Sequence, residues 1–133
     1  EKELNTKMEI AYRHVGLQVV ESDLKSFYEE VLGFELTGTM RLSPEESEAI
    51  FGISRGTDIL FGVCHGLAVE LFVVNSPLSP TFGHICIEAT QPHAIAAAAM
   101  DGGYRVHTRS RNGVETFFIS DSNHNTFEVK AKV

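Results

Sequence analysis

The chain has little of what marks membrane, disulfide-rich or nucleic-acid-binding proteins. Its 133 residues include only two cysteines, and no apolar run approaches the ~20 residues of a membrane-spanning helix. Basic residues number 11 against 18 acidic ones, and the net charge of −7 argues against binding to a phosphate backbone. We therefore expect a cytoplasmic protein. The chain begins at Glu1 rather than Met, so a leader removed before this residue is compatible with the sequence.

Other signatures are missing as well. The sequence has no glycine-rich phosphate loop, no nucleophile elbow and no Cys-x-x-Cys motif. Both cysteines, Cys64 and Cys86, lie in strand-like runs, so we expect two buried free thiols rather than a disulfide. The functional chemistry must therefore come from other residue types.

What the chain does contain is one order of strands and helices that occurs twice. Alternating apolar and polar residues predict strands over 10–20, 34–42, 57–64 and 67–74, and again over 82–89, 104–109, 114–120 and 126–132. An apolar stripe at helical spacing predicts a helix over 22–33, with Ser22 as its N-cap and Gly33 as its C-terminal cap. Ser43 and Pro44 open a short helix, and Pro92 opens an alanine-rich helix that ends near 101–103.

The two halves are in register. The interval from His14 to the helix-ending Gly33 is identical to the interval from His84 to Gly103. An internal duplication of a βαβββ unit explains this spacing. We predict one α+β domain over 1–133: two tandem βαβββ modules, at about 10–75 and about 82–132, form a curved open mixed sheet. A proline-containing linker at about 75–81 separates them.

Four residues are candidate metal ligands: His14, Glu70, His84 and Glu128. Each half of the chain contributes one His/Glu pair on strand-like sequence, with the side chains on one face of the sheet. Carboxylates flanked by apolar residues on a strand are seldom buried without a partner or a metal. Two imidazoles and two carboxylates fit Zn, Ni, Co, Mn or Fe(II), and the donor set alone does not choose among them.

We expect this site to be catalytic rather than structural. It has no thiolates, and it would face a concave polar surface where water or substrate can complete the coordination. Glu70 or Glu128 could also act as the base that removes a proton next to a metal-polarised carbonyl. One chain could supply all four ligands, or two chains could supply half each.

Four further residues are weaker candidates for substrate contacts. Gln18 and Glu88 each lie four positions after a candidate histidine ligand and would line the mouth of the cavity. Arg109 and Arg111 could hold an anionic substrate tail. They also flank the hairpin signal at Asn112-Gly113, where exposed arginines are common.

The chain resembles the vicinal oxygen chelate superfamily, which includes glyoxalases, bleomycin-resistance proteins and dioxygenases. The stretches that carry this resemblance are His14-Val-Gly-Leu-Gln-Val, Phe27-Tyr-Glu-Glu-Val-Leu-Gly-Phe34, Val69-Glu70-Leu71, Phe82-Gly-His84-Ile and Asn125-Thr-Phe-Glu128-Val. The resemblance implies paired βαβββ modules around one divalent metal, often in a homodimer.

Within the superfamily, the His-Glu-His-Glu order is most similar to bacterial-type glyoxalase I. That similarity implies nickel or cobalt, or else zinc, as the cofactor and a lyase or isomerase that moves a proton on a small substrate. Gln18 and Val74 stand where glyoxalase I has an arginine and an asparagine, and both changes affect the expected glutathione contacts.

Two alternatives are a methylmalonyl-CoA epimerase-like isomerase and a metal-free, drug-sequestering member of the fold. Epimerases of this type usually carry an amide where this chain has Glu70. Fosfomycin-resistance transferases and extradiol dioxygenases use three ligands, so Glu70 counts against them.

Overall fold

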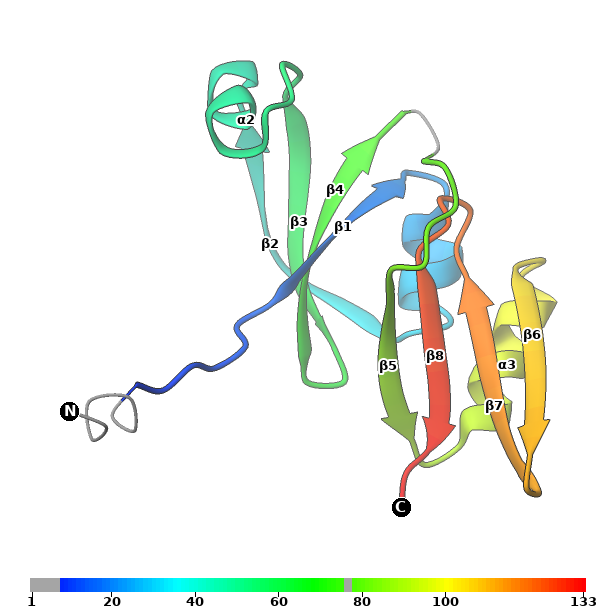
Figure 1. Ribbon diagram of the computed structural model, residues 1–133. Helices are drawn as coiled ribbons and strands as arrows, with labels where there is room; N and C mark the ends of the chain where they lie inside the picture. The colour runs from blue at the N-terminus through cyan, green and yellow to red at the C-terminus, as the bar shows by residue number, and fades with distance from the viewer. Residues whose placement is uncertain (1–7, 76–77) are drawn as a thin grey trace.

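The computed structural model describes residues 8–75 and 78–133, which form two sheets of four strands each (Figure 1). The first sheet has the order β1-β4-β3-β2, with strands β1 (Val15–Val20), β2 (Phe34–Leu42), β3 (Thr57–Cys64) and β4 (Leu67–Val74). The second has the order β5-β8-β7-β6, with strands β5 (His84–Ala89), β6 (Arg105–Arg111), β7 (Val114–Ser120) and β8 (Thr126–Ala131). In each sheet the first and last strands of the module pair in parallel and the other neighbours are antiparallel. The expected α+β class and the two βαβββ modules are confirmed.

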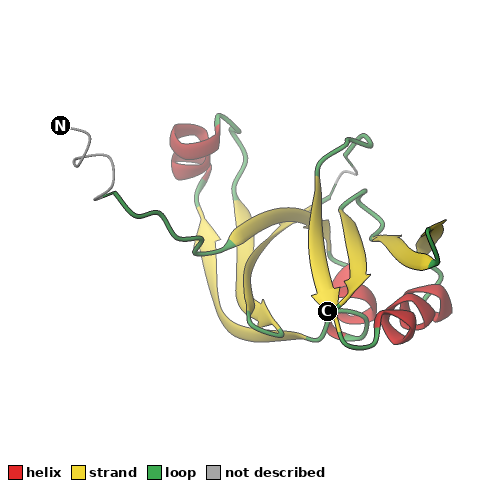
Figure 2. Cartoon of the chain, turned by 60° about the horizontal axis from the view of Figure 1, so that its bottom comes forward, coloured by secondary structure: helices red, strands yellow, loops and turns green. Residues whose placement is uncertain are grey.

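Three helices accompany the sheets. Figure 2 shows η1 (Leu24–Glu29) and α3 (Pro92–Asp101) on one side of the molecule, and α2 (Pro44–Phe51) apart from them at the end of the first sheet. η1 and α3 pack against the inner faces of the strands in one core that runs through both modules. Buried members of this core from module one include Val19, Phe27, Tyr28 and Leu71, and those from module two include Ala99, Ile119, Phe127 and Val129. None of the helices in the described residues is long and apolar enough to cross a membrane.

The helix expected over 22–33 differs from the prediction. It is a short π-helical segment, in which the amide of Glu30 donates to the carbonyl of Lys25 and the amide of Leu32 to that of Phe27. Ser22 is not its N-cap: the residue before the helix is Asp23, and its side chain makes no capping bond. The helix ends at Glu29 with Glu30 as its C-cap, so the prediction of Gly33 as the cap is wrong. Gly33 lies after the turn that follows and has the left-handed conformation, at φ 68°.

The first strand also begins later than expected, at Val15 rather than residue 10. A strand needs a neighbour to bond to, and the paired part of β4 opposite β1 begins at Val69. Within the described part of the chain, residues 8–14 are not paired with any strand, and the chain before β1 extends away from the sheet (Figure 1).

Local signals set the remaining connections. Ser43 Oγ accepts a hydrogen bond from the Glu46 amide at 3.1 Å, which caps α2 as the sequence predicts. Asn112 and Gly113 both have positive φ, at 54° and 77°, so the β6–β7 hairpin closes in two residues.

Two buried aspartates join the modules. Asp121 Oδ2 accepts a hydrogen bond of 2.6 Å from the Tyr28 hydroxyl, and burial next to this carboxylate raises the pKa of Tyr28 far above its ordinary value. In the opposite direction, Asp23 Oδ2 accepts from the amide of Ser122 at 2.7 Å, and Asp23 Oδ1 accepts from the Tyr104 hydroxyl at 3.0 Å. Each module thus supplies a carboxylate that the other satisfies.

The two cysteines are free, as expected, but only one is sheltered. Cys64 is half-buried, and burial raises its pKa to about 11. Cys86 is exposed, so the prediction of a buried thiol is wrong there. β5 lies at the edge of its sheet, and Cys86 points to the face that the core does not cover.

Candidate functional site

The first His/Glu pair lies where β1 and β4 run side by side. His14 directly precedes β1, and Glu70 lies in β4 opposite Gly16. His14 Nε2 is 3.3 Å from Glu70 Oε2, and the side chains are 47% and 21% exposed. A Cβ atom at Gly16 would lie 3.2 Å from the Phe72 ring, so glycine allows that ring to lie close over β1 beside Glu70.

The second pair repeats this geometry in module two. His84 is the first residue of β5, and Glu128 lies in β8 opposite Cys86. His84 Nε2 is 3.1 Å from Glu128 Oε1, while Lys130 Nζ is 3.4 Å from Glu128 Oε2. In both modules the glutamate faces the residue two positions after the histidine. The repeat in the sequence therefore places a histidine and a glutamate side chain at equivalent positions in both modules.

Each pair is chemically suited to hold part of a metal shell. The Nδ1 atom of His84 is 3.0 Å from the carbonyl oxygen of Phe82, which can only accept, so Nδ1 carries the proton. Nε2 then faces a carboxylate oxygen of Glu128 and presents its lone pair toward a cation held between the two atoms. Ligands bound at ~2.0–2.2 Å to one ion lie roughly 3.0–3.5 Å from each other. The separations of 3.1 Å and 3.3 Å fall in that range.

The two pairs are not together in one chain. They lie on different sheets, and among residues 8–75 and 78–133 no three His, Cys, Asp or Glu side chains come close enough to hold one ion. A single chain thus presents two separate pairs, each with one imidazole and one carboxylate.

The weaker candidates have varied surroundings. Gln18 lines a pocket beside the first pair, and its backbone carbonyl accepts hydrogen bonds from Asn123 and Asn125. Glu88 lies on β5 opposite Lys130. The Arg109 guanidinium lies 5.3 Å from the centre of the Phe118 ring, the residue opposite Glu128, whereas Arg111 is exposed at the hairpin.

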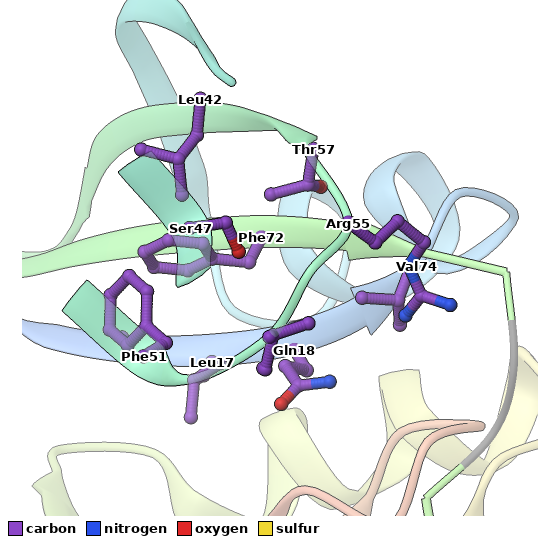
Figure 3. Close-up of a pocket in the computed structure, with 11 residues that line it drawn as sticks. Leu17, Gln18, Leu42, Ser47, Phe51, Arg55, Thr57, Phe72 and Val74 are labelled. Carbon is purple, nitrogen blue, oxygen red and sulfur yellow. The ribbon is translucent and has the colours of Figure 1, made fainter. Parts of the chain in front are cut away.

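Module one contains a pocket that is not predicted from the sequence. The pocket has a volume of about 170 Å³. Figure 3 shows it between the α2 region and strands β1 and β4. By strand register, Glu70 belongs to the same face of these strands. The rings of Phe51 from α2 and Phe72 from β4 meet edge to face at 5.5 Å within the pocket. One signal was available: α2 adds exposed apolar residues at a position where the second module has only a tight turn.

Comparison with known proteins identifies the fold. No protein-family model matches the sequence, and no curated protein matches it. Solved structures do match over nearly the whole chain. FosX, a genomically encoded fosfomycin resistance protein from Listeria monocytogenes, superposes with a TM-score of 0.71 at 16% identity, covering 95% of this chain and 96% of that one. The chain has the vicinal oxygen chelate fold.

Two further structures of this fold agree. FosX from Mesorhizobium loti gives a TM-score of 0.67 at 14% identity, with 95% of both chains covered. A glyoxalase family protein from Enterococcus faecalis gives 0.65 at 18% identity, with 94% of this chain and 98% of that chain covered. Another crystal structure of the Listeria protein contains Mn(II) and sulfate.

Proposed function

We propose that this vicinal oxygen chelate protein is a divalent-metal-dependent lyase or isomerase of the glyoxalase I type. Its metal ligands would be His14, Glu70, His84 and Glu128. The observation that carries the proposal is the same His/Glu pairing at the same strand positions in both modules. When bound, the metal would polarise the oxygen of a small carbonyl or hydroxyl substrate and so acidify the neighbouring C–H bond.

In this proposal a homodimer completes the site. The pair of module one would face the pair of module two of a second copy, and two-fold symmetry would produce two such sites. Exposed aromatic residues support this arrangement. Tyr12 and Phe82 each precede a ligand histidine by two positions, and each is fully exposed, at 103% and 101%. Large apolar side chains beside both half-sites are typical of a surface that a partner covers.

The two glutamates would share the work unequally. Among the described residues, Glu70 lies within ion-pair distance of one side chain, that of His14, whereas Glu128 lies within this distance of both His84 and Lys130. The carboxylate with fewer contacts is freer to turn toward a substrate, so Glu70 is the better candidate to accept the proton. Glu128 would serve mainly to hold the site together.

Mixing two inactive variants tests the shared site. One variant carries His14→Ala and Glu70→Ala, and the other carries His84→Ala and Glu128→Ala. Each alone should bind no metal, whereas random mixing after mild denaturation should restore about a quarter of an ion per chain, because half of the dimers then contain one intact site. His93→Ala is the matched control, since His93 forms a similar surface pair with Glu115 at 2.8 Å and should leave metal content unchanged.

The results of this experiment separate the alternatives. Metal that does not return on mixing would rule out a site shared between two chains. No metal in the unmodified protein after addition of Ni, Co, Zn and Mn would favour a metal-free, drug-sequestering function instead.

Activity measurements test the reaction. With the hemithioacetal of methylglyoxal and glutathione, Glu70→Gln should lower kcat by about 10²–10⁴-fold while metal content stays measurable. Deuterium exchange at the α-carbon of an acyl thioester, without hemithioacetal turnover, would favour the epimerase-like alternative. A kcat unchanged by Glu70→Gln would eliminate Glu70 as the base.

One observation favours a second candidate, turnover of a small anionic substrate as the fosfomycin resistance proteins suggest. Arg105 and Arg109 of β6 lie on the same face of the second sheet as Glu128. Lys130 of β8 lies on this face across β7, and its Nζ is 3.5 Å from Oγ1 of Thr116, the residue opposite Arg109. Such a basic strip could bind a phosphonate or carboxylate. Incubation with fosfomycin and Mn(II), followed by phosphorus NMR, tests this candidate, and an unchanged spectrum after long incubation would reject it.

A further inference from the structure

The pocket in module one lies next to the proposed metal site. Its floor is the face of β1 and β4 that carries Gly16 and Phe72, and Glu70 lies on the same face two residues before Phe72. Two residues span about 7 Å along a strand. A group held in the pocket is therefore within reach of a reacting centre beside Glu70.

The α2 region creates this pocket. The connection between β2 and β3 spans residues 43–56, and its residues Ser47, Phe51, Ile53 and Arg55 close one side of the cavity. The corresponding connection in module two is the Asn112-Gly113 turn, which covers nothing. The pocket is thus a feature of one module only, added beside a site that both modules build alike.

The size and lining of the pocket select a ring-sized apolar group. Its lining is mainly apolar and includes Phe51, Phe72, Leu42 and Val74. A dry cavity of roughly 150 Å³ lined by apolar side chains is large enough for benzene. The volume of about 170 Å³ is therefore enough for one aromatic ring or a branched aliphatic chain.

Polar groups lie at the opposite end from the two aromatic rings. Figure 3 shows the Arg55 guanidinium and the Gln18 amide away from Phe51 and Phe72. Among the described residues, the Arg55 side chain forms no ion pair. The chain has a net charge of −7, so a positively charged arginine at the rim of an apolar pocket would favour binding of an anionic group there.

We infer that this pocket binds an aromatic or branched aliphatic substituent of the substrate, with Arg55 pairing with an anionic group on the same molecule. The inference rests on the proposed function and deepens it by naming the substrate class: a small α-oxygenated acid with one ring-sized apolar group. The ring would fix the orientation of the substrate relative to Glu70.

Binding of simple probes tests the pocket independently of metal and turnover. The full chain, labelled with ¹⁵N, is titrated with phenylacetate, its neutral analogue phenylacetamide, and acetate, as purified and after treatment with a chelator. Phenylacetate should shift amides of α2 and β4 saturably in both samples. It should bind about three- to fivefold more tightly than phenylacetamide, as expected for one exposed charge pair, while acetate should bind too weakly to saturate.

Variants with matched controls locate the binding. Phe51→Ala should weaken both ring-containing probes about three- to tenfold through the lost aromatic contact, and Ile50→Ala, an exposed apolar residue on the same helix, should change nothing. Arg55→Gln should remove the preference for phenylacetate over phenylacetamide. Arg41→Gln is its control, because Arg41 is exposed and paired with Asp58.

The outcomes are separable from those of the metal experiment. Saturable binding that Phe51→Ala and Arg55→Gln weaken would support the pocket even if the protein holds no metal. Absence of saturable shifts in α2 and β4, or equal effects of the control variants, would overturn the inference even if the shared metal site is established.

Discussion

The two modules share one plan but differ in two connections. Glu70 follows His14 at a longer interval than that at which Glu128 follows His84. The extra length lies mainly between β2 and β3, where residues 43–56 stand in the place of the turn at 112–113. Module one therefore carries an added helix, α2, beside an otherwise repeated framework.

The second difference runs the other way. The β3–β4 turn consists of His65 and Gly66, whereas the β7–β8 connection spans residues 121–125. The longer turn contains Asp121. Its carboxylate accepts a hydrogen bond from the Tyr28 hydroxyl, and it accepts hydrogen bonds of 2.8 Å each from the backbone amides of Asn123 and Asn125. The repeated strands therefore carry the His/Glu pairs, while the unequal connections carry the pocket and the contact between modules.

The largest expected effect comes from breaking that contact. Asp121→Ala leaves the Tyr28 hydroxyl and two backbone amides without their acceptor in a buried position, so it should lower the free energy of unfolding by about 3–5 kcal/mol. Urea denaturation followed by circular dichroism measures this. Asp58→Ala, which breaks the exposed pair with Arg41, should cost about 0–1 kcal/mol. Equal losses of unfolding free energy in the two variants would show that the buried Asp121 contacts stabilise the protein no more than the exposed Asp58–Arg41 pair does.

The two cysteines differ in burial: Cys64 of module one is half-buried, and Cys86 of module two is exposed. Because only the thiolate is alkylated and burial raises the pKa of Cys64 to about 11, iodoacetamide at pH 8 should modify Cys64 at least about tenfold more slowly than the exposed Cys86. Mass spectrometry of peptides over time measures both rates. The rate at Cys64 should keep rising as the pH approaches 11. Equal rates at pH 8 would contradict the burial of Cys64.

Converting the β2–β3 connection into the short turn of module two tests which properties depend on α2. Replacing residues 43–56 with Asn-Gly gives module one the same turn as module two. The variant should remain folded and retain its metal content, and its affinity for phenylacetate should fall at least about tenfold because the pocket has lost one wall. Circular dichroism, metal analysis and the NMR titration measure these three properties. A chain that no longer folds would show that α2 is part of the framework rather than an addition to it.

The smallest expected effect concerns how the two α-helices begin. Ser43 caps α2 through its hydroxyl, whereas Gln91, before α3, makes no side-chain capping bond. Ser43→Ala should therefore destabilise the protein by about 1 kcal/mol, and Gln91→Ala by close to zero. Thermal unfolding of the two variants side by side provides the measurement. A larger loss from Gln91→Ala would contradict the capping assignment.

Much of the fold could be predicted because its signals are local. Ser43-Pro44 and Asn112-Gly113 specify a helix start and a hairpin through neighbouring residues alone, and the structure has both. The four candidate ligands stay a prediction, which rests for Glu70 and Glu128 on the need of a carboxylate between apolar strand residues for a partner. The structure places those four residues as two pairs.

Other features depend on contacts between distant segments. The start of β1 depends on where its pairing with β4 begins, and the exposure of Cys86 depends on β5 lying at a sheet edge. Whether the two His/Glu pairs lie together or apart in one chain depends on how the modules pack against each other. The repeated sequence pattern is compatible with both possibilities. The pocket depends on Phe51 of α2 meeting Phe72 of β4, although the whole of β3 separates them in the sequence.

The position of α2 has a consequence for stereochemistry. A metal site built from two identical His/Glu halves is close to two-fold symmetric, and a symmetric set of donors cannot distinguish the two ends of a molecule bound to it. A helix present on one half only removes that ambiguity. In the proposed dimer, each site would have α2 on one side and the open basic strip of β6 on the other. An asymmetric substrate could then bind in one direction, with the same face of its reacting carbon always toward the same glutamate.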